Sequence, residues 1–118
     1  MNTQEVAQDL VALCRKGQFG EAGEKYWADN VVSVEATGEN AESRGKQAAR
    51  EKGEWWSNHH DVHEVQVEGP YVNGDEFTVR FVMDITDKDS GQRTKMDEVA
   101  LYRLQGGKIA EERFFYSA

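Results

Sequence analysis

Apolar residues in the N-terminal part of the chain recur every three or four positions, the period of an amphipathic helix. One such stripe consists of Val6, Leu10, Leu13 and Cys14. Asn2 followed three residues later by Glu5 is a helix-capping pair, and Gly17 is a stop signal, so we expect a helix between them. The same period predicts a second helix over about 18–28 and a third over about 46–57.

From residue 58 onward, apolar and polar residues alternate, which is typical of strands with one buried face. The chain also contains one earlier β-branched run and two glycine-containing turns, Asn73-Gly74 and Gln105-Gly106-Gly107. Pro70 is expected between strands, and TGENAESRG (37–45) is expected to be a polar loop. The predicted strands cover about 31–35, 62–68, 76–86, 93–104 and 108–116.

This order of elements, with helices first and a meander of strands last, predicts an α+β fold. With 118 residues, the chain suits one domain (1–118) with a single core. Three helices can cover only one face of a curved, mainly antiparallel sheet. We expect that face to be the apolar one, because it has the core to bury.

Charge and composition narrow the classes of partner. Lys and Arg total 14 against 22 Asp and Glu, a net charge of −8, which disfavours nucleic acid and anionic membranes. There is no apolar run of bilayer length. The first residues, MNTQEVAQDL, lack the features of a signal peptide, so we expect a cytoplasmic protein. The single cysteine, Cys14, is expected to fill space in the core.

Four stretches carry a resemblance to a known family: YWADNVVSVEA, RGKQAAREKGEWW, GDEFTVRFVMDI and LYRLQGGKIAEERFF. They resemble the SnoaL-like group of the nuclear transport factor 2-like superfamily, which has the cystatin-like fold. The resemblance implies a cone-shaped domain with a small-molecule pocket between helices and sheet. Members include ketosteroid isomerase, polyketide cyclases, epoxide hydrolases and dehydratases, and also proteins without catalytic activity. The resemblance therefore implies a pocket and does not imply a particular reaction.

The chain departs from the isomerase pattern at its functional positions. Leu10 stands where that enzyme has a tyrosine, and Ala100 stands near the position of its proton-donating aspartate. The position of its base falls on Glu35 or on Ala36, depending on one residue of loop length. We therefore do not expect steroid isomerisation by the familiar residues.

Acidic residues in the last two strands are the candidate catalytic groups. The family pattern places Glu98, with Ala100 and Tyr102, on the apolar inner face. A three-residue turn at 105–107 would place Glu112 opposite Ala100 and diagonal to Glu98, roughly 7–8 Å apart. A two-residue turn would instead bring Arg113 inside, next to Glu98. The family pattern favours the three-residue turn.

A carboxyl group in an apolar pocket has a raised pKa and can transfer protons to or from carbon beside a carbonyl. Glu98, Glu112 and Glu35 are therefore candidates for isomerase, cyclase or dehydratase chemistry without metal or cofactor. The alternative is a non-catalytic module that binds a ligand or a protein. His59, His60 and His63 form HHxxH, but no cysteine supports a metal site. The expected pocket walls are Trp27, Trp56, Val79, Phe81, Met83, Tyr102, Phe114 and His60.

The outer face of the same strands mixes apolar residues with charges of both signs. This composition suits a two-fold interface in which each arginine meets a carboxylate of the partner, so we expect a homodimer. The outward residues are Arg80, Val82, Asp84, Asp97, Val99, Leu101, Arg103, Glu111, Arg113 and Phe115.

Overall fold

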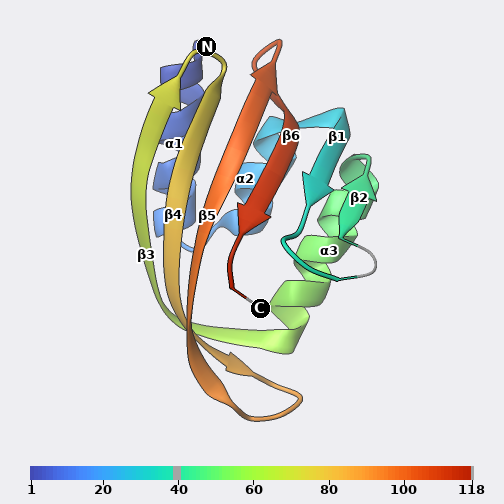
Figure 1. Ribbon diagram of the computed structural model, residues 1–118, viewed down its shortest axis with the longest axis vertical. Coiled ribbons are helices and arrows are strands. Elements are labelled where there is room, and N and C mark those ends of the chain that lie inside the picture. Colours follow the sequence, from blue (N-terminus) through green and yellow to red (C-terminus); the bar gives the residue numbers. More distant parts are fainter. Residues whose placement is uncertain (39–40, 118) are drawn as a thin grey trace.

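The computed structural model describes residues 1–38 and 41–117 and shows a curved sheet with the helices on one side (Figure 1). The elements, in chain order, are α1 Thr3–Arg15, α2 Phe19–Tyr26, β1 Trp27–Val34, β2 Glu42–Arg44, α3 Lys46–His59, β3 His60–Asn73, β4 Glu76–Asp87, β5 Arg93–Gln105 and β6 Lys108–Phe115.

The sheet has the strand order β2-β1-β6-β5-β4-β3. Strand β1 is parallel to β6, and every other neighbouring pair is antiparallel. On this shared face, α1 packs against β3 and β4 near one edge of the sheet, whereas α3 packs against β1 and β2 near the opposite edge (Figure 1). The predicted α+β class and the curved, mainly antiparallel sheet are confirmed.

The helix signals in the sequence are confirmed at the start of the chain. The Asn2 side chain accepts a hydrogen bond from the Glu5 amide at 2.9 Å, and the Glu5 carboxylate accepts one from the Asn2 amide at 3.3 Å. Helix α2 ends two residues earlier than predicted, because Trp27 already belongs to β1 and pairs with Ile109 of β6.

Two expectations about the strands are wrong. Pro70 does not separate strands but lies within β3, at a register shift between Glu68 and Tyr71. A proline is tolerated there because β3 is an edge strand with one unpaired side. The short strand β2 falls inside the predicted loop 37–45 and pairs with the end of β1. Residues 39–40 of that loop lie outside the described residues.

The β5–β6 hairpin decides which acid faces inward. Gln105 pairs with Lys108, so the turn has two residues and not the expected three. A bulge then places one extra residue, Ala110, in β6. After this bulge Glu112 pairs with Tyr102, and the predicted pairing with Ala100 is wrong. Glu112 nevertheless faces inward, because the shorter turn and the bulge each shift the pairing by one residue, and a shift of two residues keeps the same face of the strand.

The inner and outer faces of the sheet follow the predicted alternation. The inward residues of β4 are buried: Phe77, Val79, Phe81, Met83 and Ile85. On the outer face, arginines pair with carboxylates of the same chain, as in Arg80–Asp97 at 2.7 Å and Arg93–Asp84 at 2.8 Å. Among the described residues, no helix is long and apolar enough to cross a membrane.

Candidate functional site

A cavity of about 1090 Å³ lies between the inner face of the sheet and the helices. Strands β4, β5 and β6 form one wall, helices α2 and α3 form the other, and Leu10 and Cys14 of α1 contribute at one side. Its volume is comparable with that of pockets for small organic ligands. More than half of its lining residues are apolar or aromatic; of the polar ones, Glu98 and Glu112 lie on β5 and β6, whereas most of the others lie on α2 and α3.

Glu98 projects from β5 into this cavity. It is 9 % exposed, and it shares the inner face of β5 with Ala100 and Tyr102. Among the described residues, every fully enclosed side-chain oxygen has a hydrogen-bond partner, and no hydrogen bond involves Glu98. The carboxyl oxygens of Glu98 are therefore not fully enclosed and face open space in the cavity.

The surroundings of Glu98 disfavour its charged form. Burial is the largest effect, the negative charges of Glu35 and Glu112 add to it, and the positive charge of Lys52 opposes it; together they raise the pKa of Glu98 from 4.5 to about 7. A carboxyl group with a pKa near neutrality can both accept and donate a proton at physiological pH.

Glu112 lies on the same inner face but is held by two donors. The Trp27 indole N–H donates to Glu112 Oε1 at 2.9 Å, and the Ser33 hydroxyl donates to Oε2 at 2.7 Å. Ser33 is the residue of β1 that pairs directly with Glu112 of β6. Glu112 pairs with Tyr102, four residues from Glu98, or roughly 13 Å along β5. The two acids are therefore not the diagonal pair expected from the sequence.

Lys52 of α3 links the remaining polar groups. Its ammonium donates to Ser33 Oγ and forms an ion pair with Glu35 Oε1 at 3.1 Å. It also lies 5.0 Å from the centre of the Phe114 ring. Glu35, just beyond the end of β1, accepts a further hydrogen bond from the Tyr116 hydroxyl at 3.2 Å. A continuous chain of contacts thus runs from Glu112 through Lys52 to Glu35.

The structure places most of the predicted wall residues at the cavity and two elsewhere. Val79 is fully buried in the closed core, where α1 packs on β4. His60 stacks on Trp56 with ring centres 4.6 Å apart and lines a smaller hollow of about 400 Å³ beside Arg15. The predicted residues that do line the cavity are Trp27, Trp56, Phe81, Met83, Tyr102 and Phe114.

The other candidates from the sequence have different surroundings. His59 and His60 each bond through Nδ1 to a backbone carbonyl one turn earlier in α3, so these atoms donate. Among residues 1–38 and 41–117, no group of three metal-binding side chains occurs. Burial, reinforced by the charge of Glu112, raises the pKa of Cys14 to about 12, so its thiol is a poor nucleophile.

Lys52 and Ser33 were not anticipated, although each carries a signal in the sequence. Lys52 lies one helical turn before Trp56 and three residues after Ala49, on the inward stripe of α3. Ser33 follows Val31 at the two-residue period of inward positions in β1, and both are 0 % exposed. A polar residue on an otherwise apolar inward stripe is the pattern that identifies such groups.

A curved sheet closed by helices around a cavity is the nuclear transport factor 2-like fold. Within this class, a family model for the SnoaL-like domain matches residues 1–116, and the chain therefore belongs to the SnoaL-like family. Comparison with curated proteins finds no match.

Solved structures agree with this assignment. A protein from Mesorhizobium loti, described as a candidate SnoaL-like polyketide cyclase [carbohydrate phosphatase], is 50 % identical, with a TM-score of 0.95 over 98 % of this chain and 100 % of that chain. A protein from Jannaschia sp. CCS1 with a similar description is 18 % identical, with a TM-score of 0.76 over 94 % and 85 %. A nuclear transport factor 2-like protein of unknown function from Burkholderia pseudomallei is 10 % identical, with a TM-score of 0.81 over 99 % and 92 %. The last two show the fold alone.

Proposed function

We propose that the protein binds a hydrophobic small molecule in the cavity and transfers a proton on it without a cofactor, in the manner of an isomerase, cyclase or dehydratase. The observation that supports this best is Glu98, whose carboxyl group has no hydrogen-bond partner among the described residues and whose burial in the cavity raises its pKa to about 7.

The three candidate acids take different roles in this proposal. Glu98 accepts a proton from a carbon beside a carbonyl group, and the electron pair of the broken C–H bond passes toward the carbonyl oxygen; the proton then returns at the same or another position. Glu112 and Glu35 already have donors, so they hold Trp27, Ser33 and Lys52 in place and set the field at Glu98.

Proton exchange on a simple ketone tests this role without knowledge of the natural substrate. In D₂O, the wild-type protein should speed exchange of the methyl protons of 2-acetonaphthone, followed by NMR. Glu98→Gln should lower the exchange rate by about 10²-fold or more, the usual contribution of an acid–base group, while the dissociation constant changes little. Glu76→Gln, at an exposed position of β4, is the matched control.

The alternative function, a non-catalytic binding module, predicts another result in the same experiment. The ketone would bind the wild-type protein, but exchange would be no faster than with Glu98→Gln. This outcome would contradict the catalytic proposal and favour ligand sequestration.

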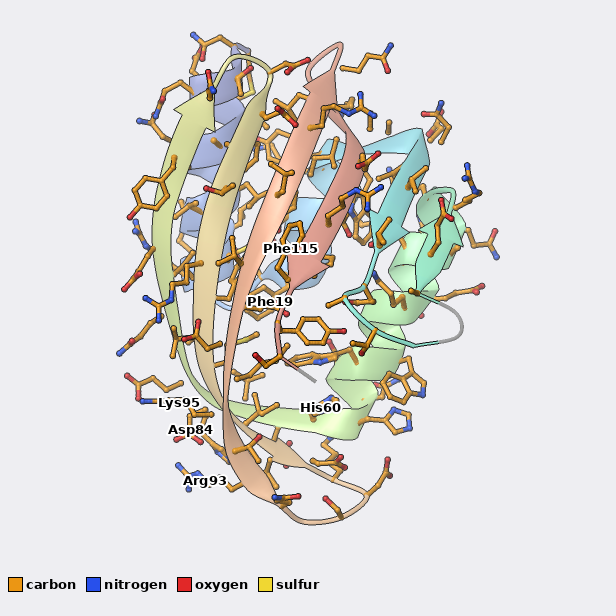
Figure 2. All side chains as sticks on the ribbon, viewed as in Figure 1. Phe19, His60, Asp84, Arg93, Lys95 and Phe115 are labelled. Atoms are coloured by element: carbon orange, nitrogen blue, oxygen red, sulfur yellow. The ribbon has the colours of Figure 1, made fainter. Side chains whose placement is uncertain are left out.

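We also propose a homodimer formed through the outer face of the sheet, in a cytoplasmic protein. Phe115 is 53 % exposed (Figure 2). Its pairing partner Val99 is 38 % exposed, and Leu101, two residues further along β5, is half-buried. The arginines of this face pair within the chain, so the proposed interface depends on its apolar residues.

A further inference from the structure

We propose that Lys52 binds the carbonyl oxygen of the ligand, and that the cavity accordingly selects neutral carbonyl compounds, such as ketones, esters or lactones, with an apolar body. This inference rests on the proposed function, because it assigns the ligand class of the same cavity. It adds the group that would receive the negative charge developing on oxygen when Glu98 takes a proton.

The first observation is the unused donor of Lys52. An ammonium group has three N–H donors. Ser33 Oγ and Glu35 Oε1 account for two of them, and among the described residues the third has no hydrogen-bonding partner. The side chain lines the cavity and is 24 % exposed, so a ligand oxygen can reach the ammonium.

The second observation is that Lys52 and Glu98 border the same space. The ammonium lies over the Phe114 ring, and Phe114 pairs with Ala100, two residues from Glu98 on the inner face of β5. The charge of Lys52 also reaches Glu98, where it lowers the pKa against the effect of burial. One small ligand can therefore contact both side chains, the carboxyl group at carbon and the ammonium at oxygen.

The third observation is the fixed position of the ammonium. The Ser33 hydroxyl donates its own proton to Glu112 and accepts from Lys52, so the direction of this hydrogen bond is set. The Tyr116 hydroxyl holds Glu35 on the other side. A donor held by such a network needs little reorganisation when charge develops on a bound oxygen.

The charge balance around Lys52 selects neutral ligands. One ammonium group is surrounded by the carboxyl groups of Glu35, Glu98 and Glu112. A ligand carboxylate would gain one attraction and meet several repulsions in a poorly hydrated space, whereas a neutral carbonyl oxygen meets only the donor. Anionic ligands of the same shape should therefore bind more weakly.

Three naphthalene compounds of similar shape test the inference: 2-acetonaphthone, 2-ethylnaphthalene without an oxygen, and 2-naphthoate. The wild-type protein should bind the ketone about tenfold more tightly than the hydrocarbon, as expected for a hydrogen bond to a charged donor, and more tightly than the carboxylate. The infrared C=O stretch of the bound ketone should fall in frequency.

Lys52→Met should remove the preference for the ketone and the frequency shift while leaving the affinity for 2-ethylnaphthalene within about twofold. The matched control is Lys95→Met, because Lys95 is exposed beside Asp84 and Arg93, away from the cavity (Figure 2). If Lys52→Met does not fold, the wild-type protein still gives an answer: the Lys52 ¹⁵Nζ resonance should shift with the ketone and not with the hydrocarbon.

Results that contradict the role of Lys52 differ from results that contradict ligand binding in the cavity. Equal affinity for ketone and hydrocarbon, an unshifted C=O stretch, or tightest binding of 2-naphthoate would overturn the role of Lys52 and leave ligand binding in the cavity intact. Failure of all three compounds to bind would overturn the proposed function together with this inference.

Discussion

Glu98 and Glu112 are the same residue type on the same face of the sheet, and their different environments suit the different roles that we propose for them. Glu112 accepts hydrogen bonds from Trp27 and Ser33, which stabilise it in one orientation. Within residues 1–38 and 41–117, Glu98 has no such donor, and burial raises its pKa to about 7. Two carboxyl groups in different surroundings have different pKa values, so that one can transfer protons while the other stays ionised.

At the scale of this residue, Glu98→Gln should raise the free energy of unfolding near pH 8 by up to about 3 kcal/mol relative to wild type, since one pKa unit corresponds to about 1.4 kcal/mol. The folded state raises the pKa of Glu98 from 4.5 to about 7, so it favours the protonated carboxyl. That contribution is complete below the unfolded pKa and is lost as the pH rises through the folded value. Glutamine stays neutral and avoids the loss.

Urea unfolding near pH 4.5 and near pH 8 measures this difference. The gain should be present at the higher pH and small at the lower one, where glutamate is already protonated in the folded state. Glu76→Gln is the control, because its carboxyl group is exposed. A gain that does not depend on pH would show that Glu98 is not the titrating group.

At the scale of elements, alternation along each strand predicted which side chains face the helices, and the structure confirms this for β4 and β5. The connection between β5 and β6 could not be predicted, because Gly106 and Gly107 suit both two-residue and three-residue turns. The bulge at Ala110 leaves no clear pattern in the sequence. Turn and bulge each shift the register by one residue in the same sense, and a total shift of two residues leaves Glu112 on the inner face, paired with Tyr102 instead of Ala100.

The cavity depends on tertiary distances that local patterns do not contain. Glu98, Lys52 and Ser33 come from β5, α3 and β1, and no repeat or spacing links them in the sequence. The position of Glu98 could be predicted from alternation and family resemblance. The contacts of Glu112 could not, because they require the parallel pairing of β1 with β6.

Two helical glycines provide a matched test of the cavity wall. A Cβ at Gly23 of α2 would lie 2.5 Å from the Trp27 indole, which is held by its bond to Glu112, whereas a Cβ at Gly53 of α3 would meet no atom within 4 Å. Gly23→Ala should therefore destabilise the protein by about 1–3 kcal/mol. Gly53→Ala should stabilise it by up to about 1 kcal/mol through helix propensity.

Chemical denaturation and tryptophan fluorescence check this pair. Gly23→Ala should also change the emission of Trp27, because the indole must move. If both variants had the same stability, close packing of Trp27 on α2 would be contradicted.

At the scale of the whole molecule, the inner face of the sheet borders the cavity proposed to bind a ligand, and the outer face is the proposed contact with a partner copy. The helices cover the inner face, and the outer face carries exposed apolar side chains between ion pairs formed within the chain (Figures 1 and 2). The net charge of −8 repels polyanions, but it does not prevent two copies from associating through apolar residues.

Val99→Asp combined with Phe115→Asp should convert a dimer into a monomer, because both changes place charge in the proposed apolar contact. Sedimentation velocity measures the mass, and circular dichroism checks that the fold remains. Tyr71→Asp, at 65 % exposure on the edge strand β3, is the control and should stay dimeric. A monomeric wild-type protein would contradict the proposed interface.

The protonation of Glu98 tests the proposed acid–base site most directly. A ¹³C NMR titration of the side-chain carboxyl carbons reports it, and Glu98→Gln assigns the resonance. The resonance should titrate with a midpoint near 7, in agreement with the pKa that burial in the cavity imposes on Glu98. A midpoint at the ordinary glutamate value of 4.5 would mean a hydrated carboxyl group and would contradict the proposed acid–base site.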